Sequence, residues 1–570
     1  MKLLVLGDDT RAFLSVVRSL GRAGAEVHVA WHDPAGPAAR SRYIRKAHAL
    51  PSIEGAWLEA FKALMRAERF DLVIPCTDPI LASLQAKRRE LEPLGRIYLL
   101  SDQAFEVASC KFKTADLARS LGIPVARELI IDSPQRAAEI RSTFELPVVL
   151  KPRTSFQPGV PGKRKVSKAY SWEAMERALA AMLPHGPVAV QENFVGRGVG
   201  VEVLMHEGKL LLAFQHIRLH EPMHGGGSSY RQGQALDPAL LEAAVRLLGA
   251  LAYTGVAMVE FKVDPASGRW ILIEVNGRFW GSLPLAVESG ADFPLALAEL
   301  LVHGRTEFPR RYIVGLCSRN WRSDLVWLRK NWRADRSDPT LAALPLSHVA
   351  IETLWNLVTL KERSDTFTLD DPMPGIAELA EIAHEVARPF ITRLPFVRRK
   401  MRARALAALA GAKRIVFVCK GNICRSPFAE HLAAAWWGAG REYLSAALLP
   451  LGERPAPPEA AEAARKRGVD LSAHRSRTLD AELVEQADVI FVFDAQNHDA
   501  VLERFPQAAG KVHFLGALAQ GGPLWIADPF GQGPGAFERA YELIWKAITP
   551  PRRASAAAVR AAAAANTGAR

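Results

Sequence analysis

One stretch, residues 414–430, constrains the fold of this chain more than any other. It begins with the apolar run 415–418, which is typical of a buried parallel strand, and Ser426-Pro427 marks the first turn of a following helix. The short loop between strand and helix directs backbone N–H groups and the positive end of the helix dipole toward one point. The sequence therefore predicts an anion-binding loop at residues 419–425.

Two side chains in this loop indicate phosphate chemistry. A thiol at a helix N-terminus that faces a guanidinium is expected to lose its proton at neutral pH, so Cys419 can attack phosphorus. Arg425 offers a planar fork of donors to two phosphoryl oxygens. Asp528, in the later segment Asp528-Pro529, is the candidate acid that protonates the leaving oxygen and then activates water.

The segment Val418-Cys419-x-Gly421-Asn422-Ile423-Cys424-Arg425-Ser426-Pro427, with Asp528-Pro529 after it, resembles the low-molecular-weight protein tyrosine phosphatase family. The resemblance covers residues 412–549 and implies a doubly wound parallel sheet without a cofactor. It implies Cys419 as nucleophile, Arg425 as phosphate clamp and Asp528 as acid and base. The residues that it implies as support for the phosphate loop are Asn422, Cys424, Ser426, Ser445 and His474.

The first hundred residues alternate strand and helix signals. Residues 2–6, 25–31 and 71–76 are expected to form strands and residues 10–23 a helix, which together predict an open parallel α/β unit. The turn at 7–9 lacks the Gly-x-Gly-x-x-Gly pattern, so no nicotinamide or flavin site is expected.

Two later strands carry acidic side chains among their apolar residues. Glu260 and Glu274 alternate with apolar residues, and Asn276 lies two residues beyond Glu274, so all three are expected on one face of a sheet. Hard oxygen ligands of this kind suit Mg²⁺ that is also bound to nucleotide phosphates. Lys111 and Lys151 would supply positive charge for those phosphates.

Together these residues resemble the ATP-grasp superfamily, whose two α+β lobes enclose ATP. The resemblance implies that Glu260, Glu274 and Asn276 hold Mg²⁺, that Lys111 and Lys151 contact phosphates, and that Glu202 contacts ribose. Arg278 would clamp the γ-phosphate or an acyl phosphate. The implied adenine hinge consists of Gln191, Glu192, Asn193, Phe194 and Val195. The implied reaction activates a carboxylate with ATP as an acyl phosphate and joins it to an amine.

The expected organisation is a pre-ATP-grasp α/β domain (1–100), an ATP-grasp domain (101–305), a helical Trp- and Arg-rich extension or linker (306–411), a phosphatase domain (412–549) and a disordered tail (550–570). The fold class is α/β with a two-lobed α+β ATP-grasp fold and a separate doubly wound parallel-sheet domain. Five cysteines in 570 residues predict a reducing, cytoplasmic compartment, and no apolar run is long enough for a membrane span.

We therefore expect a bifunctional enzyme that is an ATP- and Mg²⁺-dependent ligase and a cysteine-dependent phosphatase for phosphotyrosine-like esters. Its partners would be a small carboxylate, an amine and a tyrosine-phosphorylated protein, while the oligomeric state stays open. The net charge of +13 suits phosphate-bearing ligands, and no nucleic acid is expected. The alternative is an ATP-grasp small-molecule kinase whose C-terminal domain senses phosphate without turnover.

Overall fold

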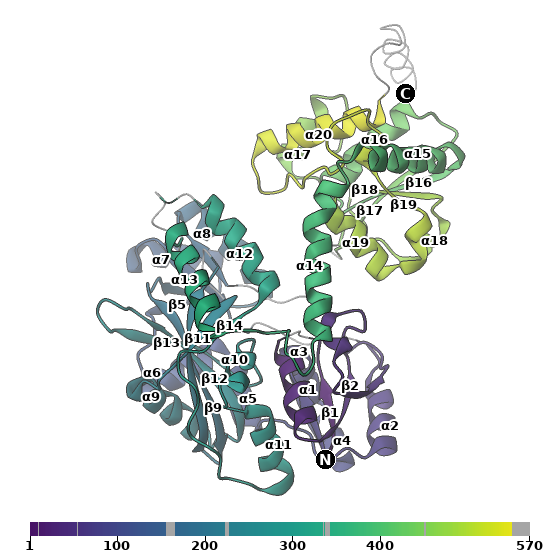
Figure 1. Ribbon diagram of the computed structural model, residues 1–570. Helices are drawn as coiled ribbons and strands as arrows, with labels where there is room; N and C mark the ends of the chain where they lie inside the picture. Colours follow the sequence, from purple (N-terminus) through teal and green to yellow (C-terminus); the bar gives the residue numbers. More distant parts are fainter. Residues whose placement is uncertain are drawn as a thin grey trace. The chain divides into compact units, whose positions relative to one another are not determined.

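A computed structural model describes residues 1–8, 11–53, 55–154, 166–222, 227–334, 336, 343–449 and 452–549. The expected tail, 550–570, lies outside these residues. The chain divides into two compact units, Met1–Ile382 and Ala383–Arg570. Figure 1 shows both units, each built around its own sheets. We describe each unit by itself.

Unit 1 begins with the expected parallel sheet, whose strand order is β3-β2-β1-β4. The central strands are buried apolar runs, and the amphipathic helix α1 places Phe13, Val16 and Leu20 against them. The strands are β1 (Lys2–Leu6), β2 (Glu26–Ala30), β3 (Ile44–His48) and β4 (Leu72–Pro75), and the helices are α1 (Ala12–Arg22), α2 (Leu58–Glu68), α3 (Asp78–Ala86), α4 (Arg88–Leu91), α5 (Asp102–Ser109) and α6 (Lys111–Ser120).

A small antiparallel sheet of order β5-β8-β6-β7 forms the second part of unit 1. Helix α8 buries Met175 and Leu179 against this sheet, and Ser171 caps its first turn by accepting a hydrogen bond from the Ala174 N–H. The elements are β5 (Glu128–Ile131), α7 (Ala137–Thr143), β6 (Val148–Pro152), β7 (Ser167–Ala169), α8 (Trp172–Met182) and β8 (Val188–Glu192).

A seven-stranded sheet of order β13-β12-β9-β10-β11-β14-β15 forms the third part of unit 1. Its register places Glu260 opposite Glu274 and Met258 opposite Asn276. The three polar residues therefore share one face, as the alternation predicted. The elements are β9 (Arg197–His206), β10 (Lys209–His220), β11 (Tyr230–Gln234), α9 (Pro238–Gly249), β12 (Gly255–Val263), β13 (Trp270–Asn276), α10 (Leu283–Glu288) and α11 (Phe293–His303).

The extension after residue 305 is more than a helical linker. Strands β14 (Cys317–Arg319) and β15 (Glu362–Ser364) join the edge of the seven-stranded sheet, and the buried Arg18 of α1 binds Asp371 with Nε to Oδ2 at 2.9 Å. Three-residue strands are held mainly by backbone hydrogen bonds, so they leave little hydrophobic pattern to find. The helices here are α12 (Trp321–Arg333), α13 (Leu346–Thr359), α14 (Met373–Ile391) and α15 (Pro395–Gly411).

Unit 2 holds the predicted parallel sheet, with strand order β17-β16-β18-β19. The fully buried Val416 and Phe417 of β16 lie at its centre, so the strand delivers Cys419 to the carboxyl edge of the sheet. The elements are β16 (Arg414–Cys419), α16 (Arg425–Trp436), β17 (Glu442–Ala447), α17 (Pro458–Arg465), α18 (Ala481–Gln486), β18 (Val489–Val492), α19 (Ala495–Arg504), β19 (Val512–Phe514) and α20 (Pro534–Ile548).

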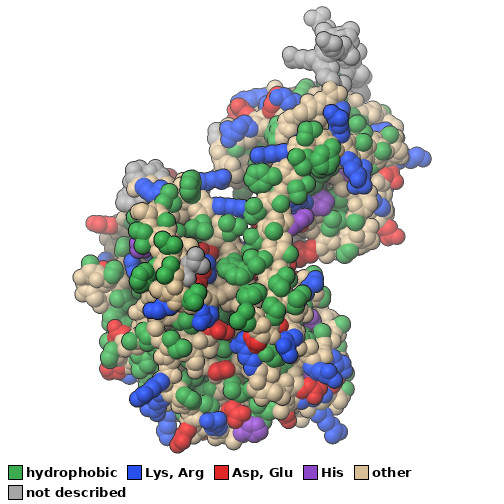
Figure 2. Space-filling view, viewed as in Figure 1, with side chains coloured by type: hydrophobic (Ala, Val, Ile, Leu, Met, Phe, Trp, Pro, Cys, Tyr) green, Lys and Arg blue, Asp and Glu red, His purple; other side chains and the backbone are tan. Residues whose placement is uncertain are grey.

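Lysine and arginine side chains are interspersed with acidic ones over the face shown in Figure 2. Among the described residues, no helix is long and apolar enough to cross a bilayer.

Candidate active sites

The loop between β16 and α16 surrounds the sulfur of Cys419 with donors. The Asn422 N–H points at the sulfur with N to Sγ at 3.3 Å, and the Ser426 Oγ lies 3.0 Å from it. The Asn422 side-chain amide donates to the Ser426 oxygen at 2.9 Å, which leaves the Ser426 proton for the sulfur. This arrangement directs two hydrogen-bond donors at the Cys419 sulfur.

Asn422 organises the loop around its own left-handed backbone, with φ of 50°. Asparagine tolerates this conformation better than most residues, and here its side chain is anchored on both ends. Its Nδ2 donates to the Ser445 Oγ at 2.7 Å, its Oδ1 accepts from the Arg477 N–H at 3.0 Å, and its carbonyl oxygen accepts from the His474 Nε2 at 2.7 Å. The structure thus brings four of the five predicted supporting residues together, because Asn422 contacts Ser426, Ser445 and His474.

The guanidinium of Arg425 is almost fully buried beside the loop, with 1% of its side chain exposed. Its Nη1 donates to Asp494 at 2.6 Å and to the Ile526 carbonyl at 2.8 Å, and its Nη2 lies 3.3 Å from the Asp528 Oδ2. Its Nε is buried without a hydrogen-bond partner among the described residues. A buried, unsatisfied donor of this kind suits a phosphoryl oxygen.

Cys424 lies at the N-cap of α16 and is buried, and burial together with the nearby Cys419 raises the pKa of its thiol. Because a protonated thiol is a weak nucleophile, Cys424 is unsuited to attack phosphorus. Asp528 keeps 38% of its side chain exposed, and Phe530 beside it is 59% exposed. Asp528 and an aromatic ring therefore both reach solvent near the loop.

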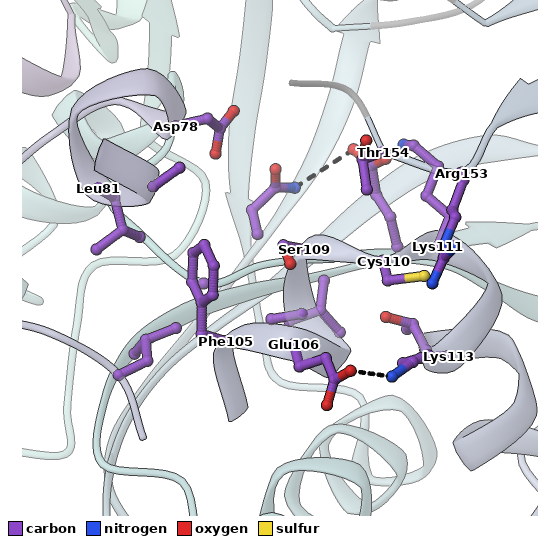
Figure 3. Close-up of a pocket in the computed structure, with 18 of the residues that line it drawn as sticks. Asp78, Leu81, Phe105, Glu106, Ser109, Cys110, Lys111, Lys113, Arg153 and Thr154 are labelled. Atoms are coloured by element: carbon purple, nitrogen blue, oxygen red, sulfur yellow. Dashed lines mark hydrogen bonds and ion pairs between the residues drawn. The ribbon is translucent and has the colours of Figure 1, made fainter. Parts of the chain in front are cut away.

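Unit 1 contains a cavity of about 660 Å³ that α3, α5, α6 and the end of β13 line. Figure 3 shows Asp78 and Leu81 on one side of it and Lys111 and Arg153 on the other. Glu274, Asn276 and Arg278 also line the cavity. A smaller cavity shares Lys111 with it and adds Lys151 and Gln191.

The three predicted metal ligands lie together, and two of them, Glu274 and Asn276, line this cavity. The Asn276 Nδ2 donates to Glu260 at 3.1 Å and to Glu274 at 3.4 Å, so one amide bridges both carboxylates. Lys111 forms an ion pair with Glu274, and the Arg218 Nη2 lies 2.6 Å from the Glu260 Oε2. The two carboxylates offer oxygens of the kind that Mg²⁺ prefers, and two cations balance their charge, while Asn276 turns its Nδ2 to them and its Oδ1 lies 3.4 Å from the Arg278 Nη2.

The charged groups of this cluster shift one another's pKa values. Burial opposes ionisation of Glu274, but Lys111 and Lys151 outweigh it and lower the pKa of the carboxyl. Burial likewise disfavours the ammonium of Lys111, and Glu274 raises its pKa. Lys151 is 8% exposed, and burial with the charge of Lys111 lowers its pKa to about 8. An additional anion beside these two lysines would favour their charged forms.

Other predicted nucleotide contacts are placed differently. Glu202 is completely buried and accepts a hydrogen bond from the Ser282 Oγ at 2.9 Å, so the expected ribose contact is corrected: a covered carboxylate cannot reach a ligand. Gln191 donates to Glu128 at 2.7 Å. Of the remaining hinge residues, Glu192 pairs with Arg127, Asn193 and Phe194 are half-buried and Val195 is 76% exposed.

Sequence reasoning missed several partners in both sites. Arg278 was expected to face phosphate, and in the structure it pairs with Asp78 with Nε to Oδ1 at 2.7 Å. Arg218, which neutralises Glu260, and Asp494, which holds Arg425, were not identified. These residues lie far in sequence from their partners, and isolated charges usually indicate only a solvated surface. The alternation of polar and apolar residues in β10 was the one signal that favoured an inward-facing Arg218.

Comparisons with known proteins agree with this geometry. Residues 233–303 match the family model "Carbamoyl-phosphate synthase L chain, ATP binding domain", and this range contains Glu260, Glu274, Asn276 and Arg278. The expected resemblance to an ATP-binding domain is therefore confirmed for residues 233–303. The chain is also similar to the crystal structure of L-amino acid ligase from Bacillus licheniformis, with 18% identity, a TM-score of 0.43 and coverage of 53% of this chain and 74% of that chain.

Residues 414–550 match the family model "Low molecular weight phosphotyrosine protein phosphatase". The chain is 38% identical over 136 residues to the probable low molecular weight protein-tyrosine-phosphatase EpsP of Ralstonia nicotianae. The aligned residues make up 24% of this chain and 91% of that protein. It is 36% identical to a protein-arginine-phosphatase of Geobacillus stearothermophilus over 21% of this chain and 80% of that protein. Through its C-terminal part, the chain belongs to the low molecular weight protein-tyrosine-phosphatase family.

Proposed function

We propose that the chain is a bifunctional enzyme, a cysteine-dependent phosphatase joined to an ATP- and Mg²⁺-dependent ligase. The observation that carries the first activity is the Cys419 sulfur, which faces the Asn422 N–H and the Ser426 hydroxyl beside the unsatisfied Nε of Arg425. A nucleophile and an anion clamp that meet in one loop are the two requirements of phosphoryl transfer to sulfur.

The phosphatase reaction follows from these positions. The Cys419 thiolate attacks phosphorus and forms an S–P bond while the P–O bond to the leaving group breaks. Arg425 and the loop N–H groups hold the phosphoryl oxygens, and Asp528 gives its proton to the departing oxygen. The Asp528 carboxylate then takes a proton from water, which attacks phosphorus and releases inorganic phosphate and the thiolate.

The substrate class proposed for this site is a phosphotyrosine-like ester on a protein. Relatives named protein-tyrosine-phosphatases support it, and so does the exposed ring of Phe530 two residues beyond Asp528, which offers an apolar face to an aromatic leaving group. Phosphoarginine is the competing substrate, because one relative is a protein-arginine-phosphatase. Parallel assays with phosphotyrosine and phosphoarginine peptides separate the two.

Changing Asp528 to Asn is expected to lower hydrolysis of an aryl phosphate by about 10²- to 10⁴-fold, since the leaving oxygen then departs without a proton. Esters with very acidic leaving groups need less protonation, so they should lose less activity. Steady-state rates measured with a series of aryl phosphates and without added metal check this. Equal losses across the series would contradict a role for Asp528 as the acid. Asp499 supplies the matched control Asp499→Asn, because it pairs with Arg388 and His498 rather than with the loop.

In unit 1 we propose that a small carboxylate is activated with ATP and then joined to an amine. Glu260, Glu274 and Asn276 would hold Mg²⁺, which when bound neutralises phosphate charge. Lys111 and Lys151 place positive charge at the walls of the two adjoining cavities. Arg278, which pairs with Asp78, would bind the γ-phosphate or the acyl phosphate. The test is ADP release with and without candidate amines. Release without an amine, accompanied by a stable phosphorylated product, would favour the kinase alternative.

The lowered pKa of Lys151 predicts how nucleotide binding depends on pH. Only the ammonium form attracts phosphate, so nucleotide affinity should fall as pH rises through about 8. Calorimetric titration with ADP from about pH 7 to about pH 9 should show this fall together with proton uptake near its midpoint. The Lys151→Arg variant keeps its charge throughout this range, so its profile should be flat. A pH-independent affinity in the original chain would exclude this role of Lys151.

We also propose a cytoplasmic location. All five cysteines are free in the structure, and two of them lie in the phosphate loop, where a reactive thiol needs reducing conditions.

A further inference from the structure

A cluster of imidazoles and carboxylates lies in the first sheet, apart from both proposed active sites. His28 of β2, His48 at the end of β3 and Glu68 at the end of α2 present one ligand atom each, and these atoms lie within 4.8 Å of one another. The two imidazoles face each other directly, with His28 Nδ1 and His48 Nε2 separated by 2.9 Å. Nearby Phe70 contacts both rings edge-on and covers them with apolar surface.

The first histidine is oriented by a carboxylate. The His28 Nε2 lies 2.8 Å from the Glu26 Oε1, and this contact places the ring proton on Nε2. The lone pair of Nδ1 then faces the cluster, where it accepts a hydrogen bond from the His48 Nε2–H. A carboxylate that holds the far nitrogen of an imidazole is the arrangement that orients histidine ligands in protein metal sites. The His48 Nε2 is directed at the same point, and it can also ligate once its ring proton lies on Nδ1.

Two lysine ammonium groups form ion pairs with the Glu68 carboxylate. The Lys2 Nζ lies 2.5 Å from the Glu68 Oε2, and the Lys46 Nζ lies 2.6 Å from the Oε1. The same Oε1 is 3.9 Å from the His48 Nε2, so it is the oxygen directed toward the imidazoles. The Lys46 side chain is 54% exposed and can swing into solvent, whereas Lys2 is 28% exposed and also donates to the Glu68 carbonyl at 3.0 Å.

We propose that His28, His48 and Glu68 form a binding site for a divalent transition-metal ion, Zn²⁺ in the first place, which displaces the Lys46 ammonium. Tetrahedral bonds of about 2.0–2.2 Å separate ligand atoms by about 3.3 Å, so the imidazoles open by a few tenths of an ångström and the carboxylate closes on them. Lys2 stays on the second oxygen and holds the carboxylate in place. Water from the side vacated by Lys46 completes the coordination.

The donor set distinguishes this ion from Mg²⁺. Imidazole nitrogens suit zinc, copper and nickel, whereas magnesium prefers oxygen ligands of the kind found at Glu260 and Glu274. The site joins three elements, β2, β3 and α2, of which β3 is the edge strand of its sheet. An ion bound there ties the edge strand to the helix and raises the thermal stability of the chain.

The test is titration of the chelator-treated full chain with Zn²⁺ in excess Mg²⁺, followed by calorimetry and thermal melting. The chain as it stands should bind one ion that His48→Ala does not bind, and Zn²⁺ should raise its melting temperature only when the site is intact. Glu26→Gln should weaken binding by about 10- to 100-fold, because the orienting carboxylate is lost. Cobalt bound at this site should give visible bands without the sulfur charge-transfer bands that Cys419 or Cys424 would produce.

Two further variants make the proposal falsifiable even if His48→Ala folds poorly. Lys46→Met keeps every ligand and removes the competing ammonium, so it should bind zinc more tightly than the unaltered chain. His303→Ala removes an exposed imidazole at the end of α11 and should change nothing. Equal zinc binding in the unaltered chain and His48→Ala, or zinc binding in Lys46→Met that is no tighter, would overturn the site. Neither outcome bears on the phosphatase or the ligase, which have separate assays.

Discussion

Replacing Cys419 by serine is expected to lower aryl phosphate hydrolysis by at least about 10³-fold, while the folded state and phosphate binding persist. The serine hydroxyl keeps its proton, and the groups around it, the Asn422 N–H and the Ser426 hydroxyl, are donors that cannot remove it. The loop N–H groups and Arg425 are untouched, so inorganic phosphate or vanadate should still bind. Rates under reducing conditions, together with calorimetric binding of phosphate, measure both expectations.

The matched control for this variant is Cys317→Ser, which changes another buried cysteine, in β14 of unit 1. It should leave aryl phosphate hydrolysis unchanged. Turnover of the Cys419→Ser variant near the level of the unaltered chain would exclude a phosphocysteine intermediate. If the unaltered chain binds phosphate and shows no turnover, unit 2 is a phosphate-sensing module.

Replacing Glu274 by glutamine is expected to reduce Mg²⁺-dependent ADP formation by at least about 10²-fold. The neutral amide removes one of two carboxylates that fit the metal, and it leaves the largely buried ammonium of Lys111 without its ion-pair partner. Both effects act on the same step, since phosphates and metal bind together. ADP release measured across a magnesium titration checks this, and part of the lost rate should return at high magnesium.

Glu106→Gln is the matched control, because Glu106 lines the same cavity but pairs with Lys113 at its periphery. It should retain ADP formation within a few-fold. Aryl phosphate hydrolysis should be unchanged in both variants, since each activity is assigned to side chains of one unit. An unchanged magnesium requirement in Glu274→Gln would show that the ion is held elsewhere.

Local patterns predicted the elements that carry chemistry. The apolar run before Cys419 and the proline after Ser426 indicated strand, loop and helix, which the structure confirms as β16 and α16. The alternation around Glu260 and Glu274 placed both carboxylates on one face, and the observed register sets them opposite each other. Both inferences depend on backbone periodicity over a few residues, and that information is local.

Long-range pairings were not predictable in the same way. The short strands β14 and β15 join the seven-stranded sheet through backbone hydrogen bonds that leave no sequence pattern. Glu202 occurs in the same alternating pattern as Glu260, but it is completely buried and accepts a hydrogen bond from Ser282, so a similar local signal has a different outcome. Burial of a charge depends on which distant segment packs over it.

By itself, the sequence determined which side chains can do chemistry, namely a thiol and a guanidinium on one loop and two carboxylates on neighbouring strands. Only the tertiary structure decided what neutralises them. It set Asp494 and Asp528 against Arg425, Arg218 against Glu260, and Lys111 against Glu274. The physical reason is that covalent geometry and hydrogen-bond periodicity act over a few residues, whereas the pairing of charges depends on distances between segments that meet only after folding.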